Sequence, residues 1–280
     1  MAQFAFPALH GLLIWWFSTA LILFLDGLPQ RTFRWSMTGA TIVLLAALYG
    51  LAASATDTSA LGAYTGFTSG VLVWAWLEIS FYTGYLTGPR RHHCPHGCHG
   101  WRHLMHAVQA SLYHEIAVLV LAGAVVALTW NRSNGFGLWT FVVLWWMHQS
   151  ARLNVFLGVS NLNAEFLPQH LDHLRSFFVH RPMNLLFPFS VTLSTLAALL
   201  LAQRALAVAD DPFRATGFAL LATLMVLAIL EHWFLVLPIS VTRLWNAMWQ
   251  WSLGARSARA KPVRAAPVAV SREVTIGGRP

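Results

Sequence analysis

Three glutamates of this 280-residue chain lie inside long apolar runs, where an ionised side chain is costly. A carboxylate in such a run costs on the order of 3 kcal/mol on membrane-insertion scales. Each must therefore face protein and be offset by a proton, a cation or a polar ligand. The residues are Glu78, the pair His114–Glu115 and the reversed pair Glu231–His232. The pattern predicts one polar site shared between apolar helices.

Mixed carboxylate and imidazole donors are typical of carboxylate-bridged dimetal sites in helical bundles. A later segment adds Glu165 and His170, five residues apart. The candidate metal ligands are Glu78, His114, Glu115, Glu165, His170, Glu231 and His232. Adjacent residues point about 100° apart on a helix, so one member of each pair would ligate while the other bonds elsewhere. Buried, hydrogen-bonded polar groups that serve packing or proton balance are the alternative interpretation.

The stretch RRHHCPHGCHGWRHLMH (90–106) is a separate candidate, because it contains six of the thirteen histidines and both cysteines. Zinc could bind Cys94, Cys98 and two of these histidines. A flexible His-rich loop with adventitious metal affinity is the alternative, since no second ligand pair stands at standard spacing. Both interpretations stay open at the level of sequence.

The elements that position these residues are membrane helices. Only 10% of the residues are charged and 57% are hydrophobic, whereas soluble domains contain about 25% charged residues. We expect an all-α polytopic membrane protein with a transmembrane domain over 1–253 and a basic, disordered cytoplasmic tail over 254–280. The expected spans are 8–26, 35–54, 65–86, 108–129, 136–157, 187–207 and 215–237.

The segment between the fifth and sixth spans has an amphipathic pattern. Apolar residues recur at helical spacing from Leu167 to Phe178, and Pro168 suits a first helical turn. We expect a helix that lies on the membrane interface and covers the polar site, bringing Glu165 and His170 to it.

Basic residues orient the chain. With seven spans, fourteen of the eighteen Lys and Arg fall on the side of the C-terminus and three on the other, with Arg152 inside a span. The positive-inside rule then predicts a cytoplasmic C-terminus and a periplasmic N-terminus. The three intramembrane glutamates then lie roughly 9–12 Å below the cytoplasmic edge. His148 and Arg152 have similar depth and share one helix face.

Four stretches carry a resemblance to a known family: EISFYTGYLTGPRR (78–91), the helix around His114, residues 138–193 with NLNAEFLPQHL and RPMNLLFP, and LEHWFLVLP (230–238). Together they resemble the PuhE family of anoxygenic phototrophic bacteria, which is encoded near the reaction-centre H subunit. The resemblance implies a role in building reaction-centre and antenna complexes or in bacteriochlorophyll supply.

The expected function is therefore an integral factor of the bacterial inner (intracytoplasmic) membrane that assists assembly of the photosynthetic reaction centre or light-harvesting complex. Its expected partners are membrane lipids, reaction-centre or light-harvesting subunits, and bacteriochlorophyll or its precursors, whose magnesium a histidine could ligate. Nucleic acid is not expected. The alternative is a dimetal, di-iron-like membrane enzyme acting on a tetrapyrrole or carotenoid, so whether the chain is an enzyme stays open. A transporter is disfavoured, because no acid lies deep in the periplasmic half.

Overall fold

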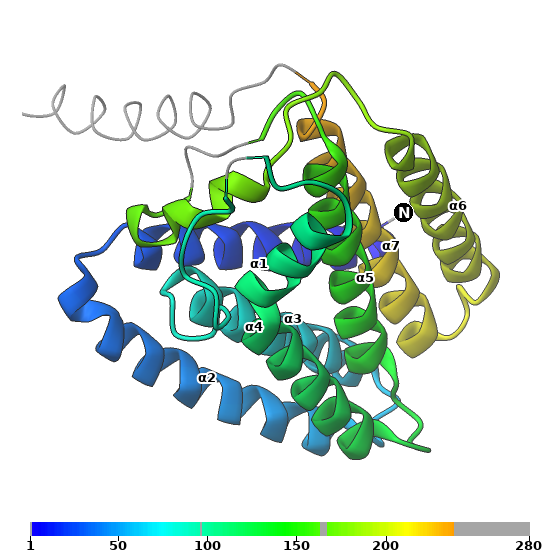
Figure 1. Cartoon of the computed structure of the whole chain (residues 1–280). Helices are drawn as coiled ribbons and strands as arrows, with labels where there is room; N and C mark the ends of the chain where they lie inside the picture. Colours follow the sequence, from blue (N-terminus) through cyan, green and yellow to red (C-terminus); the bar gives the residue numbers. More distant parts are fainter. Residues whose placement is uncertain (1, 96, 163–166, 238–280) are drawn as a thin grey trace, which may run out of the picture. The chain divides into compact units, whose positions relative to one another are not determined.

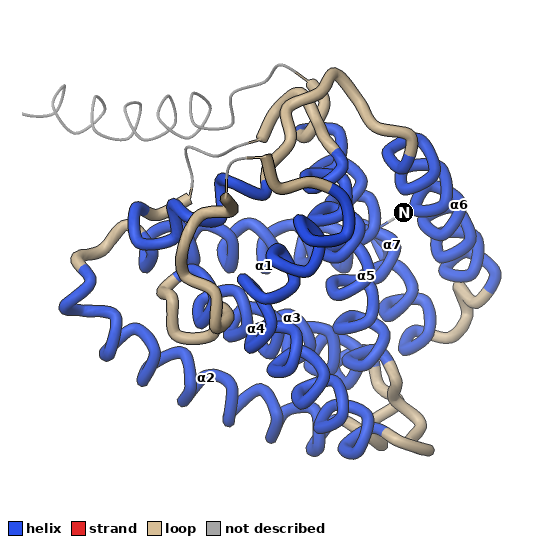
Figure 2. The backbone as a smooth tube through the Cα atoms, in the orientation of Figure 1, coloured by secondary structure: helices blue, strands red, loops and turns tan. Residues whose placement is uncertain are grey.

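The structure, a computed structural model, describes residues 2–95, 97–162 and 167–237. Helices joined by loops make up this part of the chain, which contains no β-strand (Figure 2). The α-helices are α1 Ala2–Asp26, α2 Phe33–Ser54, α3 Ala60–Tyr82, α4 Gly100–Thr129, α5 Phe136–Leu157, α6 Leu186–Ala207 and α7 Pro212–Phe234 (Figure 1). Short 3-10 helices span Gln30–Thr32 (η1) and Gln169–Phe177 (η3). The expected tail over 254–280 lies outside the described residues.

The expected all-α polytopic membrane class is confirmed. Within the described part of the chain, five helical segments are long and apolar enough to cross a membrane, and they comprise α1, α2 with η1, α4, α6 and α7. The other two, α3 and α5, form near the ranges expected for them, but their glycine, hydroxyl and amide side chains lower the hydropathy. The count of seven spans stays a prediction.

Helix α3 lies at the centre of the packing and contacts α1, α2, α4, α5 and α7. Glycines spaced by four residues on α3 let α5 approach closely, as small residues do between membrane helices. A Cβ on Gly70 would lie 2.7 Å from the carbonyl oxygen of Gly137 on α5. This close approach fixes the side of α3 that faces α5, where the site forms.

Two buried asparagines hold the ends of helices together. The amide of Asn134 donates to the carbonyls of Ser54 and Gly62, and its oxygen accepts from the N–H of Phe136 at the start of α5. Asn184 donates to the carbonyls of Asn154 and Gly158, and its oxygen accepts from two N–H groups that begin α6. Each side chain therefore satisfies a helix start and ties it to a neighbouring segment.

The amphipathic segment forms a 3-10 helix, which corrects the expectation of a regular helix at 3.6 residues per turn. Leu171, Leu174 and Phe177 are buried and pack near α4, while Asp172 and Arg175 pair at the surface. The physical reason lies in the spacing. Apolar residues exactly three apart share one face when the helix has 3.0 residues per turn.

Candidate functional site

Helices α3, α4 and α5 bring one ionisable side chain each to a common point. Glu78, His114 and His148 each offer one ligand atom, and the three atoms lie within 4.8 Å of one another. The Nδ1 atom of His148 is 3.3 Å from Oε1 of Glu78. Helices α3, α4 and α5 contact one another (Figure 1), and the three residues belong to these helices rather than to a loop.

The loop after α3 packs tightly against α4 next to His114. The backbone N–H of His114 donates to the carbonyl of Thr87, 3.1 Å away. A Cβ on Gly88 would lie 2.0 Å from the carbonyl oxygen of Gln109, so only glycine permits this approach. The TGP sequence after α3 therefore fixes α4 at the level of the cluster.

His114 is buried, with 1% of its surface exposed. Neither of its ring nitrogens has a hydrogen-bond partner among the described residues. Its ring contacts Phe81 edge-on at 5.0 Å and lies 5.7 Å from the ring of His148. A buried polar group without a partner costs about 1–3 kcal/mol, and native proteins rarely retain one without a reason. Such an imidazole is suited to ligate a metal ion.

The cluster opens at one edge. The side chains of Glu78 and His148 are 12% and 23% exposed, in contrast to His114. Trp74 supports the His148 ring edge-on at 5.2 Å. Glu78 and His148 are therefore the members of the cluster nearest the surface, and His114 is the innermost.

A family model described as a protein of unknown function (DUF3623) matches residues 1–260. The chain belongs to this DUF3623 family. It is also similar to a Rhodobacter capsulatus protein described as an uncharacterized 30.4 kDa protein in the puhA 5′ region. The two are 40% identical over 245 residues, which cover 86% of this chain and 89% of the relative. No solved structure matches.

In this DUF3623 chain, Glu115 points away from the Glu78 cluster. It forms an ion pair with Arg152 and accepts a 2.6 Å hydrogen bond from the side chain of Gln149, both on α5. The 100° separation of neighbouring helix residues accounts for the different partners of Glu115 and His114.

The reversed pair on α7 also divides. His232 is buried, and its Nδ1 and Nε2 lie 2.9 Å from the carbonyl of Ala228 and 3.0 Å from Oγ of Ser150. Glu231 is exposed.

His170, another predicted ligand, lies outside the cluster. His170 has its Nε2 2.7 Å from the carbonyl of Tyr82 and contacts the ring of Phe33. Glu165 falls outside the described residues. The structure thus brings together Glu78 and His114 of the predicted set and adds His148. The sequence signals that indicated His148 were its depth in the helix and its position four residues before Arg152.

Proposed function

We propose that this DUF3623 protein is an integral-membrane factor that assists assembly of the bacterial photosynthetic reaction centre or light-harvesting complex, or supplies its bacteriochlorophyll. The observation that carries the proposal is the gene position of the Rhodobacter capsulatus relative in the puhA region, a photosynthesis gene region. The PuhE-like motifs support the same role. The proposed location is the bacterial inner membrane, with the C-terminus in the cytoplasm.

The Glu78–His114–His148 cluster is the place where such a factor would hold its cofactor. A ring nitrogen of His114 would hold the magnesium of a chlorophyll, since neutral imidazole is a common metal ligand and neither nitrogen has a hydrogen-bond partner among the described residues. A bound bacteriochlorophyll would supply that magnesium. Glu78 and His148, at the more open edge, would orient polar groups of the pigment.

The alternative function is a metal-dependent enzyme that acts on a tetrapyrrole or carotenoid. One observation favours it: two imidazoles and one carboxylate with ligand atoms within 4.8 Å match a 2-His-1-carboxylate iron site. The described donors suffice for one ion. A dimetal centre would need a second ligand set, and Glu115, the nearest in sequence, already pairs with Arg152.

A gene replacement in Rhodobacter capsulatus tests the proposal. The relative's gene is deleted and the gene of this chain is supplied as wild type, as His114→Leu, or as the control His180→Asn, which changes an exposed histidine. We expect the deletion to lower the absorbance of assembled reaction centre and antenna. Wild type and the control should restore it, and His114→Leu should not.

The purified protein separates the two functions. A chlorophyll absorption band that is lost in His114→Leu supports pigment handling. Stoichiometric iron or manganese without pigment supports the enzyme. Normal complex assembly in the deletion strain would overturn the assembly role.

A further inference from the structure

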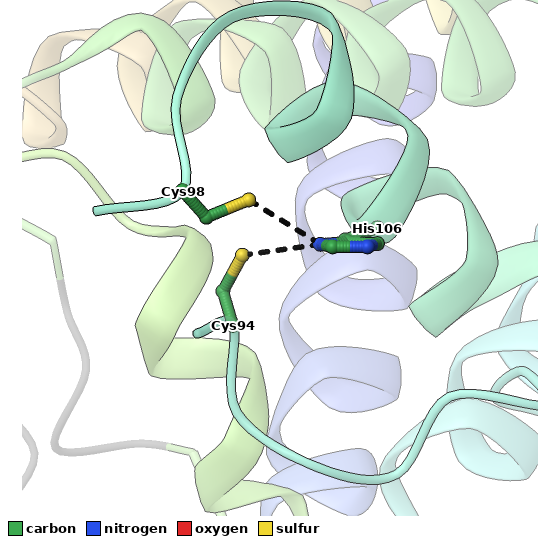
Figure 3. Close-up of side chains that lie close together, drawn as sticks. All are labelled: Cys94, Cys98 and His106. Carbon is green, nitrogen blue, oxygen red and sulfur yellow. Dashed lines mark hydrogen bonds between the residues drawn. The ribbon is translucent and has the colours of Figure 1, made fainter. Parts of the chain in front are cut away.

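A second cluster of ligand-type side chains lies between the loop after α3 and the first turns of α4. The Sγ atoms of Cys94 and Cys98 are both 3.4 Å from Nδ1 of His106, and all three atoms are within 4.8 Å of one another (Figure 3). His103 places its own Nδ1 3.3 Å from Sγ of Cys94. Both cysteines are free thiols.

Hydrogen bonds alone do not explain this arrangement. A neutral imidazole Nδ1 carries either one proton or one lone pair, so it can make one good hydrogen bond. Nδ1 of His106 has two sulfur atoms at equal distance, and Sγ of Cys94 has two imidazole nitrogens. A cation among Sγ of Cys94, Sγ of Cys98 and Nδ1 of His106 would satisfy these three atoms, which lie within 4.8 Å of one another. Nδ1 of His103 lies beside Cys94 but outside this group of three, so its ring would turn toward the same cation as the fourth ligand.

The distances agree with a tetrahedral zinc site. Zinc binds thiolate sulfur at about 2.3 Å and imidazole nitrogen at about 2.0–2.1 Å. A tetrahedral angle between such bonds separates sulfur from nitrogen by about 3.5 Å. The three observed sulfur–nitrogen separations, 3.3–3.4 Å, lie close to this value before any ion draws the side chains together.

The local fold holds the two cysteines in place. The N–H of Cys94 donates to Oγ of Ser176 on η3, 2.9 Å away, and the N–H of Cys98 donates to the carbonyl of Pro95 in a turn. Gly97, with φ of +76°, has the left-handed conformation that lets the chain turn back between the cysteines. The C-x3-C spacing is within the range of zinc sites.

The two histidines lie on one face of α4, three residues apart. The ring of His103 stacks on Phe156 at 5.3 Å and lies 5.4 Å from Phe177. Its orientation toward Cys94 is therefore fixed by packing. An open pocket of about 570 Å³ lined by Cys94, Cys98 and His103 gives an ion access from the surface.

We propose that Cys94, Cys98, His103 and His106 form a zinc-binding site that fixes the loop after α3 to α4 and η3. His103 and His106 supply the second half of the ligand set, and the sequence spacing alone did not reveal this pair. Zinc is bound by thiolates, so binding would release the protons of both cysteine thiols. Arg90 and Arg102 next to the ligands offset the charge of the two thiolates that result.

Titration of the purified, reduced, chelator-treated protein in detergent with Zn²⁺ and Co²⁺ tests the proposal. The wild type should bind one ion at this site. Its Co²⁺ form should show the intense visible bands of tetrahedral cobalt and a thiolate-to-cobalt charge-transfer band. This band identifies sulfur ligation without any variant, and it distinguishes this site from the sulfur-free Glu78 cluster.

Matched variants then separate a built site from a merely His-rich loop. Cys94→Ser with Cys98→Ser should abolish the thiolate band, and His106→Asn should weaken zinc binding more than about 100-fold, since loss of an outer-shell partner alone costs 10–100-fold. His103→Asn should shift the energies and intensities of the visible bands, because water would replace the imidazole as the fourth ligand. The control is His92→Asn with His99→Asn, which changes neighbouring histidines outside the cluster and should leave affinity unchanged.

The absence of the thiolate band in the wild type would overturn the site. So would an affinity that falls as far in the His92/His99 control as in the cysteine variant, because binding would then be adventitious. An unaltered tetrahedral spectrum in His103→Asn would overturn the assignment of the fourth ligand.

Discussion

The guanidinium of Arg152 on α5 forms an ion pair with the carboxylate of Glu115 on α4, beside the Glu78–His114–His148 cluster. The side chains of Arg152 and Glu115 keep 33% and 29% of their surface exposed. The side chain of Gln149 donates to the second carboxylate oxygen of Glu115. Both groups are therefore largely withdrawn from solvent and depend on each other. This pair accounts for one of the three acids in apolar runs and removes it from the set that needs a metal or a proton.

Arg152→Gln should destabilise the protein, because it leaves the Glu115 carboxylate without its counter-charge. We expect a loss of about 3 kcal/mol, the low end for breaking a buried pair, since both side chains keep some exposure. The free energy of unfolding in mixed detergent measures it. The double variant Arg152→Gln with Glu115→Gln should recover most of the loss. Equal losses in the single and double variants would show that the pair is not coupled.

His114→Leu should leave stability unchanged or raise it by about 1–2 kcal/mol, because it removes a buried imidazole that has no hydrogen-bond partner among the described residues. His232→Leu is the matched control. It removes a histidine of equal burial whose two ring nitrogens both have partners, and it should cost about 1–3 kcal/mol. Thermal unfolding of both variants measures the contrast. A stabilised His114→Leu that fails to support complex assembly would show that His114 is retained for function at a cost in stability.

Gly217→Ala should disturb the packing of α7 on α5. A Cβ at this position would lie 2.1–2.3 Å from ring atoms of Phe136. We expect a loss of about 1–3 kcal/mol, typical of overpacking. Gly123→Ala on α4 is the control, because no atom lies within 4 Å of its added Cβ. It should be neutral or stabilise by up to about 1 kcal/mol. Similar results for the two glycines in thermal unfolding would contradict the close contact.

Asn184→Ala should weaken the start of α6 and its attachment to the end of α5. The loss combines a helix cap worth about 1 kcal/mol with two buried hydrogen bonds of about 1 kcal/mol each. Asn184→Asp keeps the oxygen that accepts from Leu186 and Phe187, but its second carboxylate oxygen faces the carbonyls of Asn154 and Gly158 and repels them. Its loss of unfolding free energy should therefore be at least as large as that of Asn184→Ala. A loss well below that of Asn184→Ala would show that the capping oxygen, and not the two donated bonds, carries most of the contribution.

A reporter fused after Pro280 should be active in the cytoplasm, because the excess of basic residues lies on that side. A reporter inserted after Asn131, in the turn between α4 and α5, should be active in the periplasm. Alkaline phosphatase and fluorescent-protein fusions measure the two locations. The same location for both reporters would overturn the predicted topology.

The residue composition and periodicity determined much of the architecture before any contact was known. Long apolar runs predict membrane helices because backbone groups in lipid must bond within their own segment. Helices accordingly form near all seven expected ranges. Apolar residues from Leu171 to Phe177 predicted the buried side of the 169–177 segment, although their period of three produced a tighter helix than expected.

The partners of the polar residues were decided by the tertiary structure alone. Sequence gives depth along a helix and the 100° step between neighbours, but rotation about the helix axis depends on which helices pack together. The glycines of α3 and the loop at Gly88 set that rotation for α3, α4 and α5. His114 therefore faces Glu78 and His148, while Glu115 meets Arg152. In the same way, only the fold of the 94–106 loop onto α4 brings Cys94 and Cys98 to His103 and His106, because a turn through Gly97 is not visible in ligand spacing.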